Sequence, residues 1–134
     1  MPMLVIDASA ALHIALAAKA TPGLERYQLV APPLFLSERT SSLAAAAYRH
    51  EIPEEALLEA FERLEAMTVA IVDGGREHRQ QALLFARSLG WAKSYDAEYV
   101  VLARLRSIPI LTTDERLMRG AGRLVEMLDP RSFG

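Results

Sequence analysis

Short apolar segments alternate with longer amphipathic segments along the chain, and this alternation is typical of strands followed by helices. Aliphatic and β-branched runs predict strands at residues 4–7, 68–72, 108–114 and 124–128 and a short strand within residues 27–35. Helically spaced or alanine-rich segments predict helices at residues 9–20, 36–50, 53–67, 76–89, 94–107 and 114–122. Because strands separated by helices usually pair in parallel, the pattern predicts an α/β fold with a mostly parallel sheet covered on both faces.

Proline, glycine and serine residues mark the expected ends of several elements. The first helix should stop near Thr21-Pro22-Gly23, and Pro32-Pro33 should end the second strand, because proline lacks the donor that a strand ladder needs. Gly90 is expected to end the fourth helix and Ser94 to cap the fifth. The connections are too short for further domains, so we expect residues 1–134 to form a single domain.

The predicted helix at 53–67 combines an acidic face with an apolar stripe. Six glutamates between residues 51 and 65 form a face that we interpret as solvated. The apolar stripe consists of Leu57, Leu58, Phe61 and Leu64. This stripe could pack in the core of the protein, or it could contact a second copy or another partner.

Composition narrows the class of protein. With 51% hydrophobic and 24% charged residues, the chain is expected to be globular rather than disordered. The absence of cysteine excludes disulfides and thiolate metal sites. No uncharged run approaches the ~20 residues of a membrane helix, and the N-terminal apolar stretch lacks the basic region of a signal peptide. We therefore expect a cytoplasmic protein that does not enter a membrane.

Charge is distributed unevenly along the chain. The net charge is −2, but residues 76–134 carry ten basic and seven acidic side chains, whereas residues 1–75 carry five and ten. Thirteen of the 15 basic residues are arginine, whose planar fork suits phosphate and carboxylate. The C-terminal half could therefore face a polyanion. A GC-rich genome would produce the same excess of arginine, so charge alone does not identify a partner.

Four acidic residues lie at the ends of predicted elements rather than along a solvated helix face. Asp7 follows the first strand and Asp114 follows the fourth. In a parallel sheet both would emerge at the carboxyl edge, where ligand sites of α/β proteins collect. Asp96 and Glu38 lie in the first turns of helices that are otherwise largely apolar or rich in alanine.

Each of these acids has an ordinary explanation when it is taken alone. Asp7 and Asp114 could cap the helices that follow them, and Asp96 could complement a helix dipole. Four carboxylates converging at one end of a sheet would, however, repel one another and bind protons at raised pKa. A divalent cation removes this conflict, and Mg²⁺ or Mn²⁺ prefers carboxylate oxygens and water as ligands.

Other kinds of site find little support. His13, His50 and His78 are scattered on predicted helix faces without zinc-site spacing, so we expect none of them to be a ligand. The chain also lacks a P-loop, a G-x-G-x-x-G fingerprint and a G-x-S-x-G nucleophile elbow.

The stretches around the four acids resemble the acidic motifs of PIN domains, most closely those of VapC-type toxins of type II toxin–antitoxin pairs. The matching stretches are VIDASAAL, LSERTSSL, YDAEYVVLA and PILTTDERL, and their order and spacing agree over nearly the whole chain. This resemblance implies a three-layer α/β/α fold and a Mg²⁺- or Mn²⁺-dependent ribonuclease toxin. It also implies an RNA substrate and a small antitoxin as partners, and we expect a homodimer.

The same resemblance assigns roles to individual residues. The residues that match the metal-binding and catalytic acids of the family are Asp7, Glu38, Asp96 and Asp114. Ser9 and Thr112 match small polar residues that would orient the carboxylates, although turn and cap chemistry would explain both equally well. Arg39 departs from the family, in which apolar residues are commoner after the second acid, and this leaves the orientation of Glu38 open.

The expected chemistry is hydrolysis of RNA phosphodiesters by a water molecule that a bound metal ion activates. Arg116 and Arg119 follow Asp114 and are candidates for holding the RNA backbone, although a solvated helix face would have the same composition.

Alternative functions remain open at this point. The protein could be a Mg²⁺-dependent phosphohydrolase of small phosphoesters, or a non-catalytic PIN scaffold that binds RNA or a partner. A haloacid-dehalogenase-type enzyme would need a second acid where the chain has Ser9. A receiver domain would need a late lysine, and although Asp73 follows the third strand, residues 108–134 contain no lysine.

Overall fold

The computed structural model describes residues 1–17 and 20–133, and within them an all-parallel sheet of five strands forms the centre of the fold. The strands, in chain order, are β1 (Met3–Ile6), β2 (Gln28–Ala31), β3 (Val69–Ile71), β4 (Ile110–Leu111) and β5 (Met127–Leu128). The helices are α1 (Ala8–Leu16), α2 (Phe35–His50), α3 (Glu54–Ala66), α4 (Gly75–Ser88), α5 (Tyr95–Arg106) and α6 (Glu115–Ala121). Two 3₁₀ turns complete the described elements, at Leu24–Arg26 and Pro130–Ser132.

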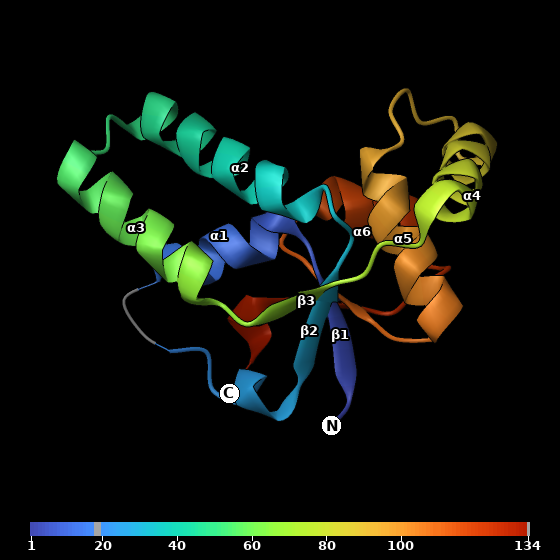
Figure 1. Ribbon diagram of the computed structural model, residues 1–134, viewed down its shortest axis with the longest axis horizontal. Helices are drawn as coiled ribbons and strands as arrows, with labels where there is room; N and C mark the ends of the chain where they lie inside the picture. Colours follow the sequence, from blue (N-terminus) through green and yellow to red (C-terminus); the bar gives the residue numbers. More distant parts are fainter. Residues whose placement is uncertain (18–19, 134) are drawn as a thin grey trace.

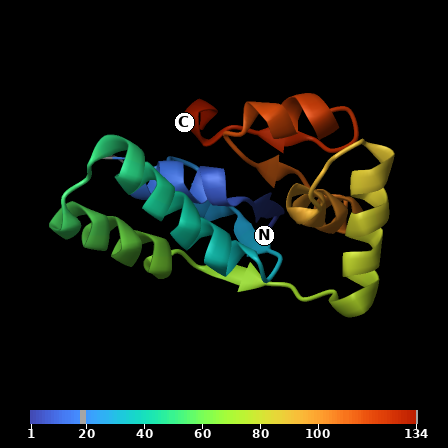
Figure 2. The ribbon, with the colours of Figure 1, turned by 90° about the horizontal axis from the view of Figure 1, so that it is seen from above.

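The order of the strands across the sheet is β3-β2-β1-β4-β5, and every pairing is parallel. Helices α1, α2 and α3 pack together on one side, whereas α4 and α5 pack together on the other (Figure 1). The view from above shows the sheet between these helices (Figure 2). The predicted α/β fold with a parallel sheet is therefore confirmed as a three-layer arrangement.

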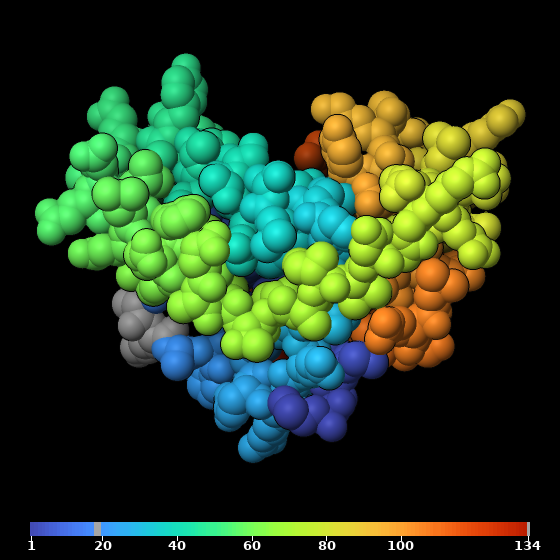
Figure 3. Space-filling view, viewed as in Figure 1, coloured from blue at the N-terminus to red at the C-terminus, as the bar shows by residue number. Residues whose placement is uncertain are grey.

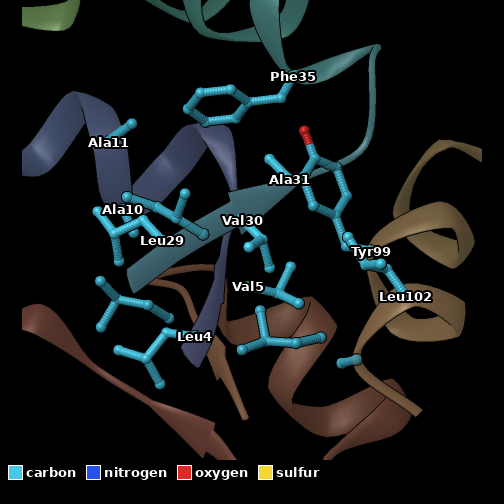
Figure 4. Packing of buried hydrophobic residues seen from close by; sticks show 14 of the residues in the cluster. Leu4, Val5, Ala10, Ala11, Leu29, Val30, Ala31, Phe35, Tyr99 and Leu102 are labelled. Carbon is cyan, nitrogen blue, oxygen red and sulfur yellow. The ribbon is translucent and has the colours of Figure 1, made fainter. Parts of the chain in front are cut away.

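The central strands are buried on both faces, which explains their continuous apolar sequences. Leu4, Val5 and Ile6 of β1 are completely buried. Side chains from β2, α2 and α5 surround them, and Figure 4 shows Val30, Phe35 and Tyr99 among the packed residues. The hydroxyl of Tyr99 in this view points toward the start of α2. The core thus extends to the carboxyl end of the sheet.

Helix α1 ends earlier than the sequence predicts. The expected stop near residues 21–23 is wrong, since α1 ends at Leu16 and Ala17 is extended, with ψ of 140°. The Ala17 N–H bonds back to the carbonyls of His13 and Ile14, and Nε of Arg63 in α3 donates to the carbonyl of Ala15. Contacts that close the helix end therefore replace a glycine or proline signal. Residues 18 and 19, which the prediction placed in this helix, lie outside the described part of the chain.

Several other boundaries follow the sequence, with two corrections. Gly90 follows the cap residue of α4, Leu89, and has a positive φ of 70°, as a helix-ending glycine requires. Ser94 does precede α5, but its side chain makes no capping hydrogen bond. The fourth and fifth strands are shorter than the predicted 108–114 and 124–128, because only Ile110–Leu111 and Met127–Leu128 join the ladder.

The apolar stripe of α3 packs mostly in the core, and one of its four residues is exposed. Leu64 is buried and Leu57 and Phe61 pack against the core, whereas Leu58 is 57% exposed. Ala60 is buried in its place, because residues 57, 60, 61 and 64 share one face of a helix. The six glutamates of residues 51–65 are all exposed, as predicted.

Arg39 departs from the family pattern but has a clear structural role. Its side chain is buried, its Nη1 donates to the carbonyl of Leu64 at 3.1 Å, and its Nη2 donates to Oε1 of Glu65 at 2.8 Å. The guanidinium also lies 5.4 Å from the ring centre of Phe35. Arg39 thereby ties α2 to the end of α3, and this fixes the rotation of α2 that turns Glu38 toward the sheet edge.

In the described part of the chain, no helix has both the length and the apolar character needed to cross a membrane.

Candidate functional site

Asp7 lies directly after β1, at the carboxyl edge of the sheet, and is buried. Its Oδ1 accepts hydrogen bonds from the backbone N–H of Ala10 at 2.9 Å and from Oγ of Ser9 at 2.7 Å. Its Oδ2 accepts a 2.5 Å hydrogen bond from Oγ1 of Thr112. Asp7 therefore does cap α1, yet its second oxygen is held by a residue that follows β4.

The register of the sheet creates this contact. Ile6 of β1 pairs with Leu111 of β4, so Asp7 and Thr112 are the next residues on two neighbouring strands. Oγ of Ser9 in turn accepts from the backbone N–H of Thr113 at 3.0 Å. The chain continues from β1 to β2 on one side and reaches β4 on the other, so this junction is the topological switch point where ligands of α/β proteins bind.

Glu38 lies in the first turn of α2 and is half-buried. Its Oε1 accepts a 2.5 Å hydrogen bond from the hydroxyl of Tyr99 in α5. Burial, and then the bond to Glu38, raise the pKa of Tyr99 far above its usual range, so the hydroxyl stays a donor. Tyr99 thus orients Glu38 from across the site.

Asp114 and Asp96 are the other two of the four candidate acids. Asp114 caps α6, since its Oδ1 accepts from the backbone N–H groups of Arg116 at 2.9 Å and Leu117 at 3.3 Å. Asp96 lies in the first turn of α5 and is exposed. The backbone N–H of Asp114 also bonds to Oγ1 of Thr112, which connects Asp114 to the network around Asp7.

The pKa values of these carboxyl groups show that they act on one another. Burial, with a smaller contribution from the charge of Asp114, raises the pKa of Asp7 to about 6 against the hydrogen bonds that lower it. Burial also raises the pKa of Glu38, to which the charges of Asp96 and Asp7 add. Desolvation and then the charge of Asp114 raise the pKa of Asp96, whereas Arg116 lowers it. The four acids therefore share one electrostatic environment.

The four candidate acids do not form a ready-made metal site. Among the described residues, no group of three or more histidine, cysteine, aspartate or glutamate side chains is already arranged to hold a metal ion. Direct hydrogen bonds unite Asp7, Ser9 and Thr112, and the backbone of Asp114 joins this group through Thr112. Glu38 and Asp96 make no hydrogen bond to it within the described part of the chain and act on it through their charges. Figure 3 shows a hollow between α2 and the start of α5, with α6 behind it.

Two residues of this region escaped the sequence prediction of the site. Tyr99 follows Asp96 by three residues and so shares its helix face, which is a signal that the sequence does offer. Glu98 is partly buried, and its charge also contributes to the raised pKa of Glu38. Nothing in the sequence distinguishes Glu98 from the exposed acids, because its position depends on how α5 packs.

The two candidate arginines differ in position. Arg116 is near enough to lower the pKa of Asp96, whereas Arg119 is exposed and forms a 3.9 Å salt bridge with Glu115 on the same helix. His13 and His50 are exposed, and His78 is buried with its Nε2 3.1 Å from the carbonyl of Glu98.

Comparison with known proteins agrees with this architecture. The PIN domain family model matches residues 4–123, and the chain therefore belongs to the PIN domain family. No curated protein sequence matches the chain.

Solved structures share the fold at low identity. PAE2754 from Pyrobaculum aerophilum is 19% identical, with a TM-score of 0.71 over 98% of this chain and 92% of that protein. FitAcB from Neisseria gonorrhoeae is 16% identical, with a TM-score of 0.60 over 98% of this chain and 100% of that one. VapBC-5 from Mycobacterium tuberculosis, a member of the VapBC family of toxin–antitoxin systems, is 10% identical, with a TM-score of 0.58 over 96% and 98%.

Proposed function

We propose that this protein is a divalent-metal-dependent endoribonuclease and the toxin of a toxin–antitoxin pair. The observation that carries the proposal is the convergence of Asp7, Glu38, Asp96 and Asp114 on the switch point of a parallel sheet. Membership of the PIN domain family supports a nuclease, and the likeness in fold to VapBC-5 supports a toxin.

The donor set fits Mg²⁺ or Mn²⁺ by its chemistry. All four candidate ligands are carboxylates, which these hard cations prefer, and burial with mutual repulsion raises the pKa of three of them. A bound cation would offset that repulsion. Because no three described acids already surround a common point, some ligands would bind through water or move inward. When bound, the metal would lower the pKa of a water molecule and stabilise charge on the phosphate oxygens.

The residues around the four acids would orient the metal ligands and the attacking water. Ser9, Thr112 and the Ala10 N–H hold Asp7 in one orientation, and Tyr99 does the same for Glu38. Asp96 is exposed and so can meet the RNA. A carboxylate that the metal does not fully engage would orient the attacking water or accept its proton.

Arg116 is the better of the two arginines for holding RNA. It lies beside Asp96 and has no salt bridge to another described residue, so it can contact a phosphate next to the reacting one. Arg119 is already paired with Glu115, and we assign it a weaker contribution to RNA binding.

The partners follow from the same proposal. An antitoxin would inhibit the enzyme by covering the acidic hollow or by placing an arginine in it, where the carboxylates would form charge-assisted hydrogen bonds. We also expect the toxin to be a homodimer.

The function is tested by offering the purified protein single-stranded RNA and p-nitrophenyl phosphate in parallel, with Mn²⁺, with Mg²⁺ or with EDTA. We expect metal-dependent RNA fragments and no release of p-nitrophenol. Release of p-nitrophenol without RNA cleavage would instead indicate a small-phosphoester hydrolase. RNA binding without any hydrolysis would indicate a non-catalytic scaffold.

A further inference from the structure

A surface cavity of about 710 Å³ lies where α4 ends and α5 begins. Its walls include two aromatic side chains, Trp91 and Tyr95, and two cationic ones, Arg87 and Lys93, and no acid lines it. This volume is in the range of ~300–1,000 Å³ that is usual for ligand sites. The cavity contains none of the four candidate acids, so it is separate from the site described above.

Of the two aromatic side chains in this cavity, Trp91 is packed against its neighbours and Tyr95 is exposed. The backbone N–H of Trp91 donates to the carbonyl of Ala86 at 2.8 Å, and its ring lies edge-on to Phe85 with 6.3 Å between the ring centres. The Trp91 ring also packs on α6, since a Cβ added at Gly120 would lie 3.0 Å from its Cζ2. Tyr95 is 55% exposed, and its ring is therefore available to a ligand.

The charges of the cavity are also available. Arg87 and Lys93 are exposed, and neither forms a salt bridge within the described residues, where the arginines that do so are Arg39, Arg119 and Arg131. A protein with a net charge of −2 thus has a cavity lined only by positive charge. Aromatic faces beside unpaired cations are the combination with which proteins bind single-stranded nucleic acid.

The cavity begins one residue away from the candidate acids. Tyr95 directly precedes Asp96, and Arg116, which acts on Asp96, is one helical turn from the Gly120 that contacts Trp91. A strand that binds at the acids therefore finds positive charge and an aromatic ring along the start of α5.

We propose that this cavity binds an unpaired nucleotide of single-stranded RNA next to the cleaved phosphodiester, with the base on Tyr95 and the phosphate between Lys93 and Arg87. The inference rests on the proposed ribonuclease function and adds a subsite to it. An RNA nucleotide supplies both a ring and a negative charge, which match the aromatic and cationic side chains of this lining.

The chain offers a direct probe, because Trp91 is its one tryptophan. A short single-stranded RNA is titrated into the protein in EDTA, which prevents metal-dependent cleavage, and tryptophan fluorescence and RNA anisotropy are recorded together. We expect RNA to quench Trp91 and Tyr95→Ala to weaken binding about 5- to 100-fold, as loss of a stacked base does. Tyr95→Phe should retain tight binding, and the double variant Arg87→Ala with Lys93→Ala should bind weakly and with a smaller salt dependence.

Matched controls lie far from the cavity. Tyr48→Ala removes a tyrosine that is 89% exposed near the end of α2, and Arg26→Ala removes an exposed arginine at the end of the first 3₁₀ turn. Both should bind RNA as the wild type does. Circular dichroism should show the same helix content in all variants, because every substituted side chain is exposed.

The outcomes separate the two proposals. If the wild type cleaves RNA but RNA neither quenches Trp91 nor distinguishes Tyr95→Ala from Tyr48→Ala, the cavity proposal is overturned and the ribonuclease remains. If the wild type neither binds nor cleaves RNA, both fail. If Tyr95→Ala converts a dimer to a monomer while RNA affinity is unchanged, the cavity is a protein interface, and the RNA subsite is likewise overturned.

Discussion

The hydroxyl of Tyr99 donates a 2.5 Å hydrogen bond to Oε1 of Glu38, and this bond joins α5 to the first turn of α2. The two residues are 61 positions apart in the sequence, so the bond exists only when the sheet and both helix layers are assembled. It aligns one acid of the candidate site from the same helix that carries another, Asp96.

Tyr99→Phe removes this bond while keeping the ring that fills the core. The bond lowers the pKa of Glu38, so its loss should raise that pKa further. It should also cost about 1.5–3 kcal/mol of unfolding free energy, as hydrogen bonds to charged groups do. Urea unfolding and NMR titration of Glu38 check both effects. Tyr27→Phe, which substitutes a partly buried tyrosine elsewhere, should change neither; equal effects in both variants would contradict the role of Tyr99.

Asp7 should make the metal-free protein less stable as pH rises. Its pKa is about 6 in the folded state against 3.8 for an ordinary aspartate, so the folded state holds the proton more tightly than the unfolded state. The proton on Asp7 therefore stabilises the folded state fully below pH 3.8, and this contribution to the unfolding free energy is lost as the pH rises to 6. It should amount to roughly 2–3 kcal/mol, at about 1.4 kcal/mol per pH unit.

This contribution is isolated by comparing the wild type with Asp7→Asn, because Glu38, Asp96 and Glu98 also have raised pKa values and act in the same direction. Denaturant unfolding between pH 4 and pH 7 in EDTA should show a smaller fall in stability for Asp7→Asn. Identical pH profiles would show that Asp7 does not titrate as the buried environment predicts.

Thr112 should matter more for the chemistry than for the fold. Its hydroxyl donates to Asp7 and accepts from the backbone N–H of Asp114, so it links the two strand ends that carry these acids. Thr112→Val should reduce RNA cleavage about 10- to 100-fold, the usual effect of losing a group that orients a metal ligand. Thr112→Ser keeps the hydroxyl and should retain most activity. A fully active Thr112→Val would show that the Thr112 hydroxyl does not orient Asp7 for catalysis.

Arg39 provides a test of the fold itself. Arg39→Ala removes a buried guanidinium with its bonds to Leu64 and Glu65 and should cost about 3 kcal/mol of unfolding free energy. Glu65→Gln, which keeps a half-exposed acceptor for Arg39, should cost less than about 1 kcal/mol. Thermal and urea unfolding measure both. Similar losses in the two variants would show that the ion pair, rather than the buried arginine, holds α2 against α3.

The sequence predicted the layers of this fold well because strand and helix periods differ clearly along the chain. The structure departs from the expected pattern where contacts between segments distant in the sequence determine the local structure. Arg63 helps to end α1, and Leu58 is exposed because Ala60 takes the buried position on α3. Neither contact leaves a signal in the local pattern.

The candidate site was predictable from the sequence only where topology alone positions its residues. Asp7 and Asp114 lie at strand ends, where topology alone brings them to one edge, and the register then places Thr112 beside Asp7. Glu38 and Asp96 reach that edge through the rotation of their helices, which depends on buried side chains such as Arg39 and Tyr99. Periodicity does not specify that rotation.

The most direct test of the account is metal-dependent RNA cleavage by Asp96→Asn, measured beside the wild type and the matched control Asp73→Asn. Asp96 is exposed, so its substitution should leave the fold intact, and Asp73 is an exposed aspartate after β3 and outside the four candidate acids. We expect Asp96→Asn to abolish cleavage in Mg²⁺ and in Mn²⁺, whereas Asp73→Asn should cleave as the wild type does. Full cleavage by a folded Asp96→Asn protein would contradict this prediction.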